Sequence, residues 1–131
     1  MSLYVRDGHS ATALERMKVK PGIWFTPLHS AECSHAIAQQ VFYRKISPAE
    51  AEAVFDSLKH DRADGLWLET AMPENAFEVC ADLGRRYGPK LGMRTLDTLH
   101  VACAQELKAE RFWTFDERQA KLAKAVGLKT S

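Results

Sequence analysis

Three acidic residues stand beside apolar stretches, where a carboxylate is costly to bury. Asp97 opens the apolar run of residues 97–104, Asp116 directly follows the apolar residues 112–115, and Glu32 comes shortly after residues 23–25. A helix N-terminus returns only about 0.3 to 1 kcal/mol to an anion, which is small beside the cost of removing a carboxylate from water. We therefore expect a cation beside these acids.

The choice of cation follows from the other residues near the acids. Carboxylate oxygens without a Cys/His cage suit Mg²⁺ or Mn²⁺ better than Zn²⁺. His29 and Cys33 are spaced as two zinc ligands would be on a helix, but no second Cys/His pair of suitable spacing accompanies them. The sequence also lacks the glycine-rich nucleotide-binding motifs and the G-x-S-x-G elbow. We interpret the acids as a Mg²⁺ or Mn²⁺ site.

Each acid also has a structural explanation, and these alternatives stay open. Asp116 could be the N-cap of a helix, with Gln119 completing an approximate capping box. Glu32 could pair with a Lys or Arg on a solvated helix face. Asp97 is harder to explain in this way, because its helix is apolar on nearly every side and is expected to be buried.

A basic stretch leads into Asp97. Its members are Arg85, Arg86, Lys90 and Arg94. The ordinary explanation is solvated charge at helix ends, and for His100, one turn after Asp97, a hydrogen-bonded core histidine. Next to an acidic cleft, Arg94 and His100 would instead contact a phosphate. With a net charge of +1, the chain has no general polyanion-binding surface, so such a site must be local.

Short apolar strands alternate with helices along the chain. We expect strands at residues 23–25, 66–68 and 112–115 and an edge strand from 128, with helices at 9–18, 26–44, 47–58, 73–89, from about 94, and 116–126. This order predicts a three-layer α/β/α fold with a parallel sheet. Because such sheets place their sites beyond the carboxyl ends of the strands, Glu32 and Asp116 should lie at one edge.

Size and composition indicate one globular domain spanning residues 1–131. The chain is 46% hydrophobic and 27% charged, without an apolar run near the roughly 20 residues that span a bilayer. Three cysteines, Cys33, Cys80 and Cys103, lie in apolar helical patterns without a C-x-x-C pair. Reduced thiols and the absence of a signal peptide favour a cytoplasmic protein without a membrane segment.

The acidic residues lie in motifs that resemble the PIN-domain family, and VapC-type toxin ribonucleases in particular. That family has an Asp opening a helix of the form D-x-L-H-x-A-x-A, which matches Asp97 with His100. A later strand ends in T-x-D, which matches Thr114 with Asp116. The segment TPLHSAECSHAI resembles the family's second acidic motif and matches Glu32. The order of elements is similar over nearly the whole chain.

The resemblance implies a metal-dependent endoribonuclease. Glu32, Asp97 and Asp116, with Thr114, would hold one or two Mg²⁺ or Mn²⁺ ions that activate water for in-line attack on an RNA phosphodiester. VapC-type members are usually encoded with an antitoxin that covers the acidic cleft, and they commonly form homodimers. The expected partners are therefore RNA, a cognate antitoxin and a second copy.

One part of the family pattern is not found. The family begins with a mid-sheet strand ending in L-D-T/S, whose Asp is the first ligand, whereas this chain starts MSLYVRDG, and Asp7-Gly8 is typical of a turn. We expect an N-terminally truncated domain without its central strand, with an incomplete metal site and impaired cleavage. The alternatives are an inactive PIN-like module that binds an antitoxin or itself, and an unrelated α/β domain whose acids are caps.

Overall fold

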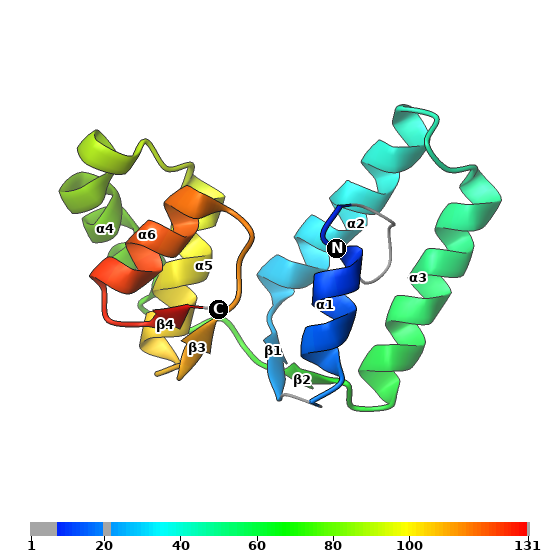
Figure 1. Ribbon diagram of the computed structural model, residues 1–131, viewed down its shortest axis with the longest axis horizontal. Helices are drawn as coiled ribbons and strands as arrows, with labels where there is room; N and C mark the ends of the chain where they lie inside the picture. Colours follow the sequence, from blue (N-terminus) through cyan, green and yellow to red (C-terminus); the bar gives the residue numbers. More distant parts are fainter. Residues whose placement is uncertain (1–7, 20–21, 131) are drawn as a thin grey trace. The chain divides into compact units, whose positions relative to one another are not determined.

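A computed structural model describes residues 8–19 and 22–130 (Figure 1). The chain divides into two compact units, Met1–Ala71 and Met72–Ser131. Each unit is built from helices and one pair of short parallel strands, and the units are described in turn. Within the described residues, no helix has both the length and the apolar character that crossing a membrane requires.

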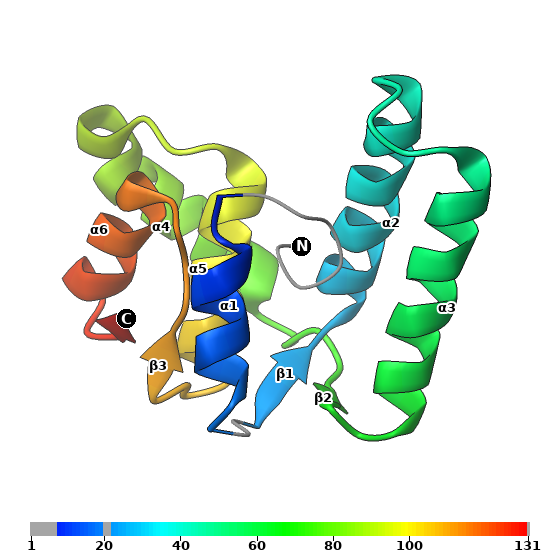
Figure 2. The same ribbon diagram turned by 45° about the vertical axis from the view of Figure 1, so that its right-hand side comes forward.

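The first unit is dominated by a helical hairpin. Its elements are α1 (Ser10–Met17), β1 (Ile23–Phe25), α2 (Pro27–Phe42), α3 (Pro48–Ala63) and β2 (Trp67–Glu69). Helices α2 and α3 run side by side and are joined by a tight turn at the end far from β1 and β2 (Figures 1 and 2). The strands are parallel, with Ile23 opposite Trp67 and Phe25 opposite Glu69.

Helix α2 begins with a histidine-based cap. The backbone N–H of Thr26 donates to Nδ1 of His29 over 3.1 Å, and Oγ1 of Thr26 lies 2.9 Å from the same nitrogen. Because only an unprotonated ring nitrogen accepts an amide hydrogen, this arrangement requires neutral imidazole. The ring also stacks on Phe25 at 5.7 Å. These contacts give His29 a structural role that differs from the zinc alternative.

Helix α3 begins as predicted. The backbone N–H of Glu50 donates to Oγ of Ser47 over 3.1 Å, and the backbone N–H of Ser47 donates to Oε2 of Glu50 over 2.6 Å. Pro48 occupies the first helical position, where its missing N–H costs nothing. Both bonds favour ionised Glu50, so they lower the pKa of its carboxyl group.

The second unit surrounds a buried helix. Its elements are α4 (Ala76–Leu91), α5 (Thr95–Glu106), β3 (Arg111–Phe112), α6 (Glu117–Ala125) and β4 (Lys129–Thr130). Helices α4 and α6 both pack against α5, whose residues Leu99, Val101, Ala102 and Cys103 are all at most 3% exposed. The predicted burial of this helix is confirmed. Strands β3 and β4 pair in parallel.

Several element ends differ from the sequence-based expectation. The predicted strand at 112–115 stops at Phe112. Helix α4 starts at Ala76 and continues through Pro89 to Leu91, because a proline in the last turn removes only one hydrogen bond. The helix ends at Gly92, whose φ of +60° suits glycine, and whose N–H donates to the Gly88 carbonyl over 2.8 Å. Helix α1 begins at Ser10, so this serine is not its N-cap.

The α/β class with parallel strands is confirmed, but the four strands do not form one sheet. They form two separate pairs, β1–β2 and β3–β4, and no strand among the described residues joins them. Strands of two or three residues in two-stranded sheets contribute little stability alone. Helix packing must therefore stabilise each unit.

The capping box of α3 predicts a measurable effect on stability. Ser47→Ala removes the acceptor for the Glu50 N–H and should lower the free energy of unfolding by about 1 kcal/mol in urea titrations. Ser57→Ala is the matched control. Ser57 is exposed in the middle of the same helix, and its hydroxyl donates to the Ala53 carbonyl alone. The control should change stability by less than about 0.5 kcal/mol. Equal losses in both variants would contradict the capping argument.

Candidate functional site

Asp97 lies in the first turn of α5 and has a cationic partner in the chain itself. Nε of Arg94 donates to Oδ2 of Asp97 over 3.0 Å, and the Asp97 side chain is 24% exposed. The cation expected from the sequence is therefore provided, at least in part, by an arginine. Because the Arg94 side chain is 77% exposed, this ion pair contributes at most about 1 kcal/mol.

Asp116 is the N-cap of α6. Its Oδ1 accepts the backbone N–H of Gln119 over 2.9 Å, so the capping alternative considered for this residue is confirmed. The cap uses one of the two carboxylate oxygens of Asp116. In the same way, the ion pair with Arg94 uses one of the two oxygens of Asp97. Within the described residues, Oδ2 of Asp116 and Oδ1 of Asp97 have no hydrogen-bond partner.

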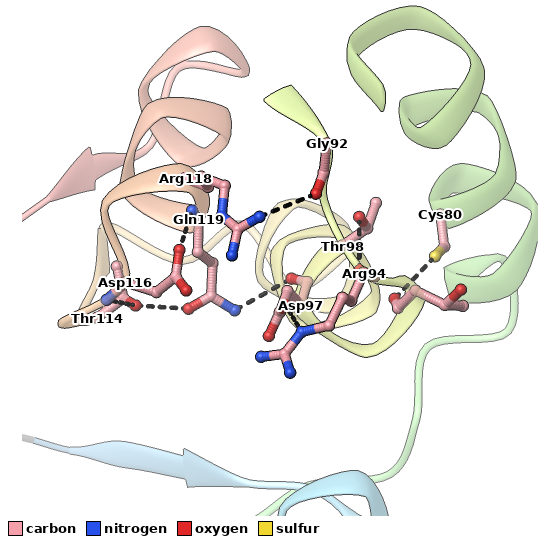
Figure 3. A network of polar contacts seen from close by, with 10 residues as sticks. Cys80, Gly92, Arg94, Asp97, Thr98, Thr114, Asp116, Arg118 and Gln119 are labelled. Carbon is pink, nitrogen blue, oxygen red and sulfur yellow. Dashed lines mark hydrogen bonds and ion pairs between the residues drawn. The ribbon is translucent and has the colours of Figure 1, made fainter. Parts of the chain in front are cut away.

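Gln119 connects the two acids, a role that the sequence did not reveal. Its side chain is buried, Nε2 donates to the backbone carbonyl of Asp97 over 3.1 Å, and Oε1 accepts from Oγ1 of Thr114 over 2.5 Å. Figure 3 shows this amide between the first turns of α5 and α6. The sequence indicated Gln119 only as a capping partner of Asp116. The bond to Asp97 joins residues 22 positions apart, beyond any local pattern.

Thr114 completes the network. Its hydroxyl donates to Gln119 and accepts the backbone N–H of Asp116 over 3.0 Å. These bonds explain the threonine without a metal, and its expected ligand role stays a prediction. Arg118 donates to the carbonyl of Gly92 over 3.3 Å and so ties α6 to the segment before α5 (Figure 3).

The basic stretch lies mostly on a solvated helix face. Arg85 and Arg86 on α4 pair with Asp82 at 3.7 and 3.4 Å, all three with at least half of the side chain exposed. This is the ordinary explanation for such charges. Arg94 contacts Asp97 instead, and His100 is half-buried one turn further along α5. Contact of Arg94 and His100 with phosphate stays a prediction.

Glu32 belongs to the first unit, where it lies half-buried in the second turn of α2. Near the start of this helix, Arg62 donates from Nε and Nη2 to the carboxylate of Glu69 over 2.5 and 3.1 Å. These bonds lower the pKa of Glu69. The guanidinium also lies 4.7 Å from the centre of the Phe25 ring. Sequence patterns do not reveal these contacts of Arg62, because Glu69 and Phe25 come from separate strands.

An open depression of about 570 Å³ lies beside this arginine. Its lining residues come from the start of α2, the end of α3 and the end of β2, namely Pro27, Ser30, Ala31, Ser34, Arg62, Glu69, Thr70 and Ala71. It thus lies beyond the carboxyl ends of two parallel strands, where α/β folds place their sites. Glu32 is not among the lining residues.

The donor set can be compared with what a metal ion needs. In neither unit do three or more His, Cys, Asp or Glu side chains of the described residues gather closely enough to hold an ion. The carboxylates of Asp97 and Asp116 are the type of oxygen donor that Mg²⁺ or Mn²⁺ prefers, and the bonds from Arg94 and Gln119 use one oxygen of each. Burial raises the pKa of the Cys33 thiol and so favours its protonated form.

The Gln119 network should be measurable in stability. Gln119→Met keeps the length of the side chain but removes its two hydrogen bonds, to the Asp97 carbonyl and the Thr114 hydroxyl. The loss should cost about 1 to 3 kcal/mol of unfolding free energy in urea. Gln105→Met is the matched control, because Gln105 is exposed on α5. Similar stability of the two variants would show that the buried amide does not hold the helices together.

A family model described as the PIN domain matches residues 2–125, which covers most of both units and includes all the candidate site residues. No curated protein and no solved structure matches the chain significantly. PIN domains are generally nucleases that use divalent metal ions. Since the match covers nearly the whole sequence, the chain belongs to the PIN-domain family.

Proposed function

We propose that this protein is a metal-dependent endoribonuclease of the VapC toxin type that acts in the cytoplasm. Family membership supports a nuclease acting on RNA or another nucleic acid. The observation that carries the proposal is the buried Gln119 amide, which links the first turns of α5 and α6. These turns bear Asp97 and Asp116, the two acids in the motifs that most resemble VapC-type proteins.

In this proposal the acids hold the cofactor and the basic residues hold the substrate. Asp97, Asp116 and Glu32 are the ligands of Mg²⁺ or Mn²⁺, with Thr114 as a further oxygen donor. When bound, such an ion lowers the pKa of a water molecule and neutralises charge on the reacting phosphate. Gln119 keeps Asp97 and Asp116 in place.

Arg94 is suited to bind the phosphate. Its side chain is 77% exposed, so an incoming backbone can reach the guanidinium next to Asp97. Arginine matches phosphate geometry through its planar set of N–H donors. We assign His100, one helical turn from Asp97, to the same phosphate contact.

A second candidate function is an inactive PIN-like module that binds an antitoxin or its own copy. Two observations favour it. The described residues of neither unit contain a group of three potential metal ligands. Helix α1 has no buried residue, and Leu14 on it and Val19 just after it are 54% and 76% exposed. Apolar side chains this exposed suit a protein partner. A cognate antitoxin and a homodimer are proposed partners under either function.

Cleavage assays separate the two candidates. Asp97→Asn and Asp116→Asn should each lower the rate of Mn²⁺-dependent RNA cleavage by about tenfold to a hundredfold, because each removes a charged ligand. Asparagine is as good an N-cap as aspartate, so Asp116→Asn should keep its fold. Asp82→Asn is the matched control, because Asp82 is an acid of the same unit that pairs with arginines on α4.

The outcomes are distinct. Cleavage by Asp97→Asn at the rate of the wild-type chain would refute the proposed mechanism. A wild-type chain that cleaves no RNA, with or without Mn²⁺, would favour the interaction module. Circular dichroism spectra of all variants would show whether a lost activity reflects the site or a lost fold.

A further inference from the structure

We propose that the turn between α2 and α3 is a contact site for single-stranded RNA. The site, called the hairpin tip below, consists of Phe42, Tyr43, Arg44 and Lys45. The two aromatic rings stack on bases, and the two cations contact phosphates. This inference rests on the proposed ribonuclease function, because it names a contact of the RNA substrate other than the acidic residues.

The first observation is the exposure of two adjacent aromatic side chains. Phe42 and Tyr43 are 79% and 63% exposed, although aromatic residues normally bury most of their surface. Their rings meet edge to face, with centres 5.2 Å apart and an interplanar angle of 78°. They stand at the end of the hairpin far from β1 and β2 (Figure 2), so no other element of the first unit covers them.

The second observation is the backbone of Arg44. Its φ of +56° lies in the left-handed region, where glycine is the usual residue after a helix. The conformation lets the N–H groups of Arg44 and Lys45 close the last turn of α2 on the carbonyls of Val41 and Gln40, both over 2.9 Å. Glycine would adopt this turn with less strain. Lys108 has the same conformation after α5, with a φ of +55°, so long basic side chains are tolerated in this turn.

The third observation is the charge of the hairpin tip. Arg44 and Lys45 are exposed and form no ion pair with any described residue. The next acid along the chain is Glu50, whose carboxylate accepts the N–H of Ser47. Exposed aromatic rings beside cations that lack acidic partners match the two parts of a single strand, its unstacked bases and its phosphates.

A second copy of the chain fits the hairpin tip less well. Symmetric self-association would place Arg44 and Lys45 against the same residues of the partner, and like charges repel. Two aromatic side chains also provide far less than the roughly 800 Å² that each partner buries in a stable interface. The observations therefore favour RNA.

Binding measured without metal tests the inference. Fluorescence anisotropy of a labelled oligouridine strand in EDTA gives the affinity of the full chain without cleavage. Phe42→Ala and Tyr43→Ala should each weaken binding about fivefold or more, as the loss of a stacked base does. Phe77→Ala is the matched control, since Phe77 is an equally open aromatic, 67% exposed on α4, without an adjacent basic residue. It should leave the affinity unchanged.

Arg44→Gly tests the ionic part separately. Glycine keeps the left-handed turn, so the variant should be at least as stable as the wild-type chain in urea. It should weaken binding and reduce the slope of log affinity against log salt concentration by about 0.7, the value for one phosphate contact on a single strand. A weakened affinity with an unchanged salt slope would overturn the assignment of Arg44 to a phosphate.

The outcomes distinguish this inference from the proposed function. If the wild-type chain binds RNA and cleaves it with Mn²⁺, but Phe42→Ala and Tyr43→Ala bind equally well, only the hairpin tip is overturned. If the wild-type chain binds RNA through the hairpin tip and never cleaves it, only the ribonuclease function fails. Absence of binding overturns both. Variants that lose self-association in sedimentation experiments, yet bind RNA normally, would assign the hairpin tip to a protein interface.

Discussion

The second unit depends on one buried amide. A buried primary amide is tolerated only when its donors and acceptor are paired, and Gln119 meets this condition by bonding the Asp97 carbonyl and the Thr114 hydroxyl. Because these partners lie on α5 and just before α6, satisfying the amide fixes the two helices in one register. The placement of the acids Asp97 and Asp116 is a consequence of that register.

Structural and chemical roles are compatible for these acids. Asp116 uses Oδ1 to cap α6, and Asp97 uses Oδ2 to bind Arg94. Each contact orients a carboxylate through one oxygen and leaves the other available, which is how a ligand is held in advance of a cation. Arg94 offsets the cost of partly burying the Asp97 carboxylate, so this cost alone is not evidence for a metal. Family membership is what supports a divalent ion.

What the sequence predicted well was local. The capping box of α3 needs only Ser47 and Glu50, three residues apart, and the apolar pattern of α5 needs only its own residues. The hydrogen bonds of the Thr114 hydroxyl and the pairing of Arg62 with Glu69 depend on contacts that no periodicity encodes. The same limit applies to Gln119. The fold class and the capping role of Asp116 were therefore predictable, whereas the contacts of Gln119 and Arg62 were not. The single sheet edge expected for Glu32 and Asp116 is not found, because the strands form two separate pairs.

Chemistry and selection make different demands on a ribonuclease. Carboxylates and a divalent ion act on a phosphodiester, which is the same at every nucleotide, so they cannot distinguish one RNA from another. Selection requires contacts to bases, and exposed rings such as Phe42 and Tyr43 favour unstacked bases over a duplex. Stacking tolerates any base. A nuclease that relied on such rings would therefore select accessible single-stranded loops first and would need further contacts to read a sequence within them.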